Sequence, residues 1–121
     1  MTDIKETLSK KRSYEAELRF LKERLKDQRN KVTVKQQERI EFLEYQLLCI
    51  ASWMTLLSED EAFVIQRHLI DSIDIPRIAV EYRERWGEEF GKTERTIKTY
   101  QRRALQRIEE FEKQKDELLQ G

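Results

Sequence analysis

The segment Thr93–Ile108 reads TERTIKTYQRRALQRI and decides the fold of the chain. Its apolar side chains recur at steps of three and four residues, as on one face of an α-helix, and are Ile97, Tyr100, Ala104, Leu105 and Ile108. Thr93 is a residue type that caps helix N-termini. Because the apolar spacing continues through Phe111, we expect a long final helix from Thr93 to about Leu119.

Another helix start lies upstream, in Leu57–Glu61. Ser58 and, three residues later, Glu61 have the spacing of a capping box, in which each side chain bonds the backbone N–H of the other residue. The acidic residues after Ser58 also suit the positive end of a helix dipole. We therefore expect a helix over about Glu59–Ile70 that ends near Asp71–Ser72.

The next helix is expected to begin at Asp74 and to run to about Trp86. Asp74 is a favoured N-cap residue, and Pro76 fits the first turn, where backbone N–H groups have no helical partner. Gly87 supplies a stop, and Glu88–Lys92 link this helix to the final one. The spacing predicts that this helix buries Ile78, Ala79 and Tyr82 and exposes Arg77, Glu81 and Arg85.

Two long helices are predicted before residue 58. Apolar residues at near-helical spacing predict one helix over about Asp3–Gln28, and β-branched residues indicate a break around Asn30–Thr33. A second helix follows over about Val34–Leu57, and its apolar positions alternate steps of three and four. From Leu47 to Met54 it is apolar nearly all round, so we expect it to be the most buried helix.

The composition agrees with an all-α fold. Charged residues make up 40% of the 121-residue chain, which has 3 Gly and 1 Pro, and this favours long helices with solvated faces over sheets. The expected architecture is a long N-terminal helical hairpin over residues 1–57. A three-helix helix-turn-helix unit with an extended C-terminal helix follows over residues 58–121.

The charge of the chain is concentrated in one place. The 24 basic and 24 acidic residues give a formal net charge of zero, so the total does not favour a polyanionic partner. From Lys92 to Arg107, however, six basic residues face one acid, Glu94, for a local net charge of +5. Such a stripe suits a protein that contacts phosphates at one surface, and by itself a solvated helix face explains it equally well.

Two short helices, a turn and a third helix rich in Arg, Lys, Thr and Gln have the layout of a helix-turn-helix. The residues expected to bind DNA are Lys92, Thr93, Glu94, Arg95, Thr96, Lys98, Thr99, Arg102 and Arg103. Those expected to reach base edges in the major groove are Arg95, Lys98 and Thr99. Those better placed for phosphates are Lys92, Arg102 and Arg103. Glu94 either accepts a hydrogen bond from cytosine or compensates the helix dipole.

Several stretches resemble a known family: Leu57–Glu61, Val64–Ile65, Ile78–Ala79, Thr93–Ile97 and Arg103–Ile108. They are similar to region four of bacterial sigma factors, and the similarity extends over about residues 34–111. With two long helices in front and no other sigma regions, the chain resembles phage late-gene transcriptional activators of the ArpU/RinA type. The resemblance implies sequence-specific binding to promoter DNA, with RNA polymerase as a further contact, by a protein that is not an enzyme.

The chain departs from the sigma pattern between Ala79 and Thr93. The fourteen steps between them are about twice what the sigma-type turn uses, so either the second helix is extended or an insertion lies around Trp86–Gly91. The acidic residues of this region would repel phosphates. We expect the insertion to face away from the DNA backbone or toward a protein partner.

No catalytic set of residues emerges from the sequence. His68, the one histidine, is expected to have a structural role, and Cys49, the one cysteine, to be a buried apolar side chain in a reducing compartment. We expect no cofactor and no metal. The longest apolar stretch, Leu47–Leu57, is too short for a bilayer span, and the polar N-terminus is unlike a signal peptide, so a cytoplasmic protein without a membrane partner is predicted.

The favoured function is a DNA-binding transcriptional regulator, an activator of phage or prophage genes whose partner is double-stranded DNA. One alternative is a DNA-packaging accessory protein, such as a small terminase-like subunit. Another is a helical interaction module that does not bind DNA. The heptad-like seams are compatible with a homodimer and with an intramolecular bundle.

Overall fold

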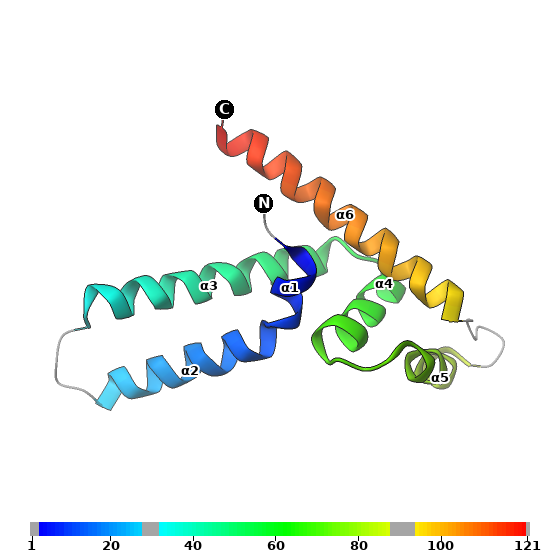
Figure 1. Cartoon of the computed structure of the whole chain (residues 1–121), viewed down its shortest axis with the longest axis horizontal. Coiled ribbons are helices and arrows are strands. Elements are labelled where there is room, and N and C mark those ends of the chain that lie inside the picture. The colour runs from blue at the N-terminus through cyan, green and yellow to red at the C-terminus, as the bar shows by residue number, and fades with distance from the viewer. Residues whose placement is uncertain (1–2, 28–31, 88–93, 121) are drawn as a thin grey trace.

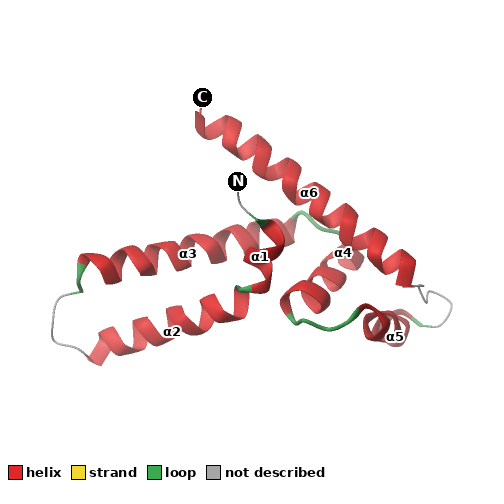
Figure 2. Cartoon of the chain, in the orientation of Figure 1, coloured by secondary structure: helices red, strands yellow, loops and turns green. Residues whose placement is uncertain are grey.

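The computed structural model describes residues 3–27, 32–87 and 94–120 (Figure 1). Every element in these residues is a helix and none is a strand, which confirms the all-α expectation (Figure 2). The elements are α1 (Ile4–Ser9), α2 (Lys11–Asp27), α3 (Val34–Thr55), α4 (Glu59–Val64), the π-helical η1 (Ile65–Ile70), α5 (Ile75–Trp86) and α6 (Glu94–Gln120). None of these helices is both long and apolar enough to cross a bilayer.

The prediction of a single helix over Asp3–Gln28 is wrong, because the chain turns at Lys10 and forms two helices. Asp3 caps α1 by accepting from the backbone N–H of Glu6, and Lys10 leaves helical geometry with φ −93° and ψ 1°. The turn has a packing reason. It lets Leu8 enter the core while α2 runs away beside α3 (Figure 1).

Helices α2 and α3 run antiparallel and side by side (Figure 1). The break expected around Asn30–Thr33 ends in a capping box, in which Thr33 and Gln36 bond each other's backbone N–H groups and start α3. Arg39 of α3 forms a two-pronged ion pair with Glu17 of α2. The hydrogen bond from Arg39 lowers the pKa of the Glu17 carboxyl.

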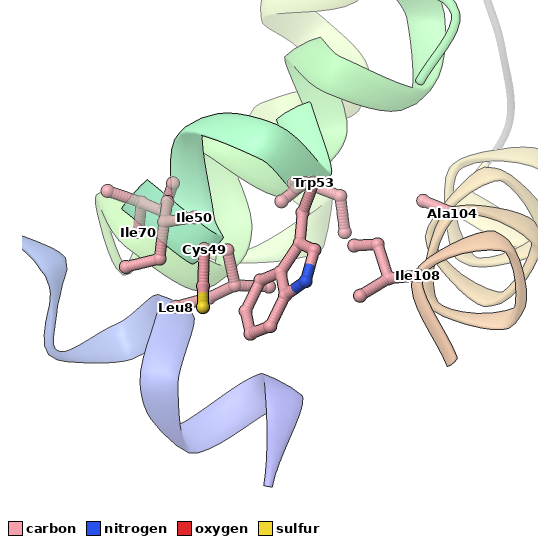
Figure 3. Packing of buried hydrophobic residues seen from close by; sticks show 8 residues of the cluster. Leu8, Cys49, Ile50, Trp53, Ile70, Ala104 and Ile108 are labelled. Atoms are coloured by element: carbon pink, nitrogen blue, oxygen red, sulfur yellow. The ribbon is translucent and has the colours of Figure 1, made fainter. Parts of the chain in front are cut away.

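The main core lies where α1, α3, η1 and α6 meet (Figure 3). Trp53 is its largest fully buried side chain, and Leu8 and Ile108 pack into the same cluster from α1 and α6. Cys49 is buried there, as the sequence predicts. This cluster joins residues on both sides of residue 58, so the N-terminal helices and the following helices share one core.

The helix expected over Glu59–Ile70 is present, and its second half, η1, is a π-helix. The capping box between Ser58 and Glu61 is confirmed. A π-helix is wider than an α-helix, so its last backbone bonds reach further back, as in Asp71 N–H to the Gln66 carbonyl. Ser72, with φ 61°, reverses the chain after η1, and the ring of His68 lies 2.8 Å from the Ile73 carbonyl oxygen.

Helix α5 has the expected bounds, but the roles of Asp74 and Glu81 differ from those expected. The Asp74 backbone occupies the N-cap position, yet its side chain makes no capping hydrogen bond, contrary to the expectation. Gly87, with φ +91°, ends the helix in a conformation that favours glycine. Glu81, expected to be exposed, is largely covered, because Arg67 of η1 reaches across and binds it.

Arg67 is the centre of an ion network between η1, α5 and α2. Its guanidinium donates to both carboxylate oxygens of Glu81, at 2.9 and 2.7 Å, and to Asp71 at 2.9 Å. Asp71 also accepts from Arg12 of α2. The hydrogen bonds from Arg67 lower the pKa of Glu81. Burial of Asp71 raises its pKa, but hydrogen bonds from Arg67 and Gln66 and the charge of Arg12 outweigh it, so this pKa is lowered as well.

We predict that the protein loses stability in acid through this network. Because folding lowers the pKa of Asp71 and Glu81, their contribution is complete above the unfolded-state values of about 4 and is lost as pH falls through the folded values. In Arg67→Met, which cannot donate, we expect a lower urea midpoint at pH 7 and a weaker fall in stability between about pH 5 and 2. Urea titrations followed by circular dichroism measure both.

The matched control is Arg77→Met. Arg77 is mostly exposed and its Nε lies 3.8 Å from Glu81, so this substitution should leave the acid profile nearly as it is. An unchanged profile in Arg67→Met would contradict the role of the network.

Candidate nucleic-acid interface

The first half of α6 is held by a second apolar cluster. Ile97 is fully buried and packs with Val64 of α4 and with Ile78 and Ala79 of α5. Two turns later, Ala104 and then Ile108 are buried in the main core. The apolar face predicted from the sequence is therefore the inner face of α6, and one helix closes both clusters.

Tyr82 of α5 organises the aromatic part of this cluster. Its ring stacks on Trp86 with centroids 4.3 Å apart and lies 6.4 Å from the ring of Tyr100 on α6. The Tyr82 hydroxyl donates to the Asp60 carboxylate of α4. Burial of the phenol, together with this hydrogen bond, raises the pKa of Tyr82, so the ring stays neutral. These contacts tie α4, α5 and α6 together.

Glu61 connects the start of α4 to α6. Its carboxylate is almost completely buried, and it accepts from the backbone N–H of Ser58 at 3.0 Å. The Nε of Arg107 lies 3.3 Å from the other carboxylate oxygen. Arg107 belongs to the basic stripe seen in the sequence. Its charge is paired with Glu61 of the same chain, and this ion pair holds α6 against α4.

The outer face of the first half of α6 carries the remaining positive charge. Arg95, Lys98, Arg102 and Arg103 are all exposed. Within residues 3–27, 32–87 and 94–120, no acidic side chain forms an ion pair with any of these four. From Arg95 to Arg102 is seven residues, about 10 Å at 1.5 Å per residue, and nearly two full turns. The two side chains therefore extend from the same side of the helix, with Lys98 between them.

The other predicted site residues fall in three groups. Glu94 is exposed in the first turn, beside the positive end of the helix dipole. Thr96 and Thr99 are half-buried at the edge of the outer face, and the Thr99 hydroxyl donates to the Arg95 carbonyl at 3.0 Å. Lys92 and Thr93, with the expected cap of α6 and most of the 86–91 insertion, lie outside the described residues.

One residue of the outer face was missed in the sequence. Gln106 is exposed and lies one turn beyond Arg102, so it extends the polar face past the four exposed cations. Its offset of eleven residues from Arg95, close to three turns, is the signal that places it there. After Gln106 the exposed face turns acidic, with Glu109 and Glu110.

This arrangement can bind a polyanion. The four exposed cations have no acidic partner among the described residues, so they repel one another and need not break an ion pair with these residues when phosphates approach. Arg95, Lys98 and Arg102 lie along one side of α6. In the part of the chain that the structure describes, no three His, Cys, Asp or Glu side chains are placed to hold a metal ion.

Comparison with known proteins adds no family to this geometry. No protein-family model matches the chain, and no curated protein and no solved structure gives a significant match.

We predict that the placement of α6 depends on Ile97. Truncation in Ile97→Ala leaves a cavity between α4, α5 and α6 and should lower the free energy of unfolding by about 3 kcal/mol. Lys98→Ala, the neighbouring exposed position, should change it by less than about 0.5 kcal/mol. Urea unfolding followed by circular dichroism compares the two, and equal effects would contradict the assignment of inner and outer faces.

Proposed function

We propose that the protein is a sequence-specific DNA-binding transcriptional regulator that inserts the first half of α6 into the major groove. The observation that carries the proposal is the set of four exposed cations, Arg95, Lys98, Arg102 and Arg103, which form no ion pair with a described residue and lie on a helix whose opposite face is buried. The basic face is thus rigidly presented, because rotating α6 would expose Ile97 to water. In this proposal, α4, η1 and α5 act as the supporting helices of a helix-turn-helix.

Individual roles follow from position along α6. Arg95 and Lys98 lie near the end that enters the groove, so we assign them to base edges, where the Arg95 guanidinium has the geometry to bind guanine in two-pronged fashion. Arg102 and Arg103 lie one to two turns further out and are assigned to phosphates. Thr99, whose hydroxyl already donates within the helix, is left with its methyl group and an acceptor oxygen for the DNA.

The biological part of the proposal rests on the resemblance to phage activators of the ArpU/RinA type. It assigns the protein to activation of phage or prophage genes in the cytoplasm, with RNA polymerase as a further contact. The exposed acidic residues Glu109 and Glu110 give a protein partner an oppositely charged surface next to the basic one.

The first experiment is selection of bound duplexes from a random pool. We expect one motif to be enriched by the wild-type chain and to weaken when Arg95 and Lys98 are both changed to Ala. Enrichment of no sequence, with no binding even at low salt, would favour a helical interaction module instead.

Single substitutions separate base readers from phosphate contacts. On the selected duplex, Arg95→Ala should cost about 1–3 kcal/mol of binding free energy and relax the preference at one base pair. Arg102→Ala should weaken binding to all sequences alike and reduce the slope of log K against log salt by about 1. Fluorescence anisotropy over a range of salt concentrations measures both quantities.

Arg24→Ala is the matched control. Arg24 is also exposed and outside every described ion pair, but it lies near the end of α2, far from the start of α6 (Figure 1). It should leave affinity and salt slope unchanged. An effect as large as that of Arg102→Ala would mean that any surface arginine contributes, which argues against a specific reader helix.

A further inference from the structure

Helix α5 carries three arginines, and two of them lie beside acidic residues. Arg77 lies 3.8 Å from Glu81, and Arg85 donates to Glu59 of α4 at 3.4 Å. Arg83 is exposed and forms no ion pair, hydrogen bond or ring contact with any residue that the structure describes. Among the described residues, it is therefore the α5 arginine that needs to break no contact to bind an external anion.

Arg83 extends from the side of α5 that is turned away from α4. The opposite side is identified by Arg85, which bonds Glu59 of α4 and lies 5.6 Å from the ring of Phe63, also on α4. Two residues separate Arg83 from Arg85, and two residues correspond to about 200° around an α-helix. The Arg83 side chain therefore has its base on the side of α5 away from α4.

This side of α5 faces the beginning of α6. Helix α5 meets α6 at Tyr100, whose ring lies 6.4 Å from that of Tyr82. Helix α4 meets α6 seven residues later, where Glu61 pairs with Arg107. From α5, then, α4 lies toward the later residues of α6, as Figure 1 shows. The opposite direction leads to Arg95, which lies about 7.5 Å before Tyr100 along the helix.

We propose that Arg83 binds a phosphate of the DNA backbone at the edge of the groove that receives the first turns of α6. This inference rests on the proposed DNA-binding function and extends its contact surface from α6 to α5. Arg83 and Arg95 extend from the same end of the molecule, so a duplex that reaches one of them lies close to the other. A guanidinium suits this partner, because its planar set of N–H groups binds phosphate oxygens in pairs.

The position of Arg83 favours the backbone over the bases. The major groove is about 12 Å wide, and one α-helix with its side chains has a diameter of about 10–12 Å. Once α6 occupies the groove, α5 remains at its edge, where the phosphates are. Such contacts fix orientation without reading sequence. Arg83 thus adds a contact on a second helix, which limits how far α6 can tilt or turn in the groove.

The acidic neighbour of Arg83 lies on another side of α5. Glu84 is two residues from the buried Tyr82, which places it about 200° around the helix, on the side opposite the core. Arg83 is about 100° from Glu84 and closer to α6. A duplex that approaches α6 therefore meets the cation before the anion. In Glu84→Gln we expect a smaller change in DNA affinity than in Arg83→Ala.

The main test compares Arg83→Ala with Arg85→Ala in the full chain, on the selected duplex and on one of random sequence. Each variant removes one positive charge from an exposed position of α5. Arg83→Ala should weaken both complexes several-fold and reduce the slope of log K against log salt by about 1. Arg85→Ala should leave the slope unchanged, because its side chain is on the α4 side. Fluorescence anisotropy measures affinity, and circular dichroism checks that each variant is folded.

Replacing single phosphates identifies the contact. Neutral methylphosphonates are placed one at a time along both strands of the selected duplex. At one position we expect the wild-type chain to lose as much affinity as Arg83→Ala loses on the natural duplex. At that position Arg83→Ala should lose no more, because the two changes remove the same contact. Arg102→Ala should show this behaviour at a different phosphate.

Three results would overturn the inference. They are an unchanged affinity in Arg83→Ala, equal effects of Arg83→Ala and Arg85→Ala, and the absence of any phosphate whose loss is shared with Arg83→Ala. In each case the wild-type chain still binds DNA, so the proposed function stands. Failure of the proposed function gives a different result, in which the wild-type chain binds no duplex even at low salt, and it removes the partner of Arg83 as well.

Discussion

The burial of one stripe of α6 is the constraint on which the rest of the structure depends. Ile97, Ala104 and Ile108 are completely removed from water, the first in the cluster with α4 and α5 and the other two in the core with α1 and α3. Burying each isoleucine contributes roughly 1.5–3 kcal/mol, so any rotation of α6 is unfavourable at both clusters together. The direction of every other α6 side chain follows from this.

Polar contacts set the position of α6 along its own axis, which apolar packing alone leaves loosely determined. Glu61 binds Arg107 near the middle of the helix, and Trp53 binds Glu112 about one and a half turns later. Leaving one of these buried or half-buried groups without its partner would cost stability. The two contacts therefore fix the position of α6 along its axis. An exception is the side-chain oxygen of Gln101, which is buried without a hydrogen-bond partner in the described structure.

The charges along α6 divide the helix into two surfaces. In the first half the exposed cations form no ion pair with a described acidic residue, whereas from Glu109 to Glu117 five acidic residues outnumber two lysines. A positive surface suits a polyanion, and a net negative one suits a basic surface. In the proposed function the positive half of this rigid helix is the DNA reader.

Local chemistry determined where most helices begin and end. The capping box at Ser58, the break before Val34 and the stop at Gly87 each depend on residues within four positions of one another, and the apolar spacing of α6 placed its inner face correctly. The turn at Lys10, the covering of Glu81 by Arg67 and the pairing of Arg107 with Glu61 were not readable from the sequence. Each of these features either joins segments that are far apart along the chain or depends on how such segments pack together. Periodicity identifies which side of a helix is apolar, but only the assembled structure decides which charged side chains meet a partner and which remain free for a ligand, because that depends on distances between helices.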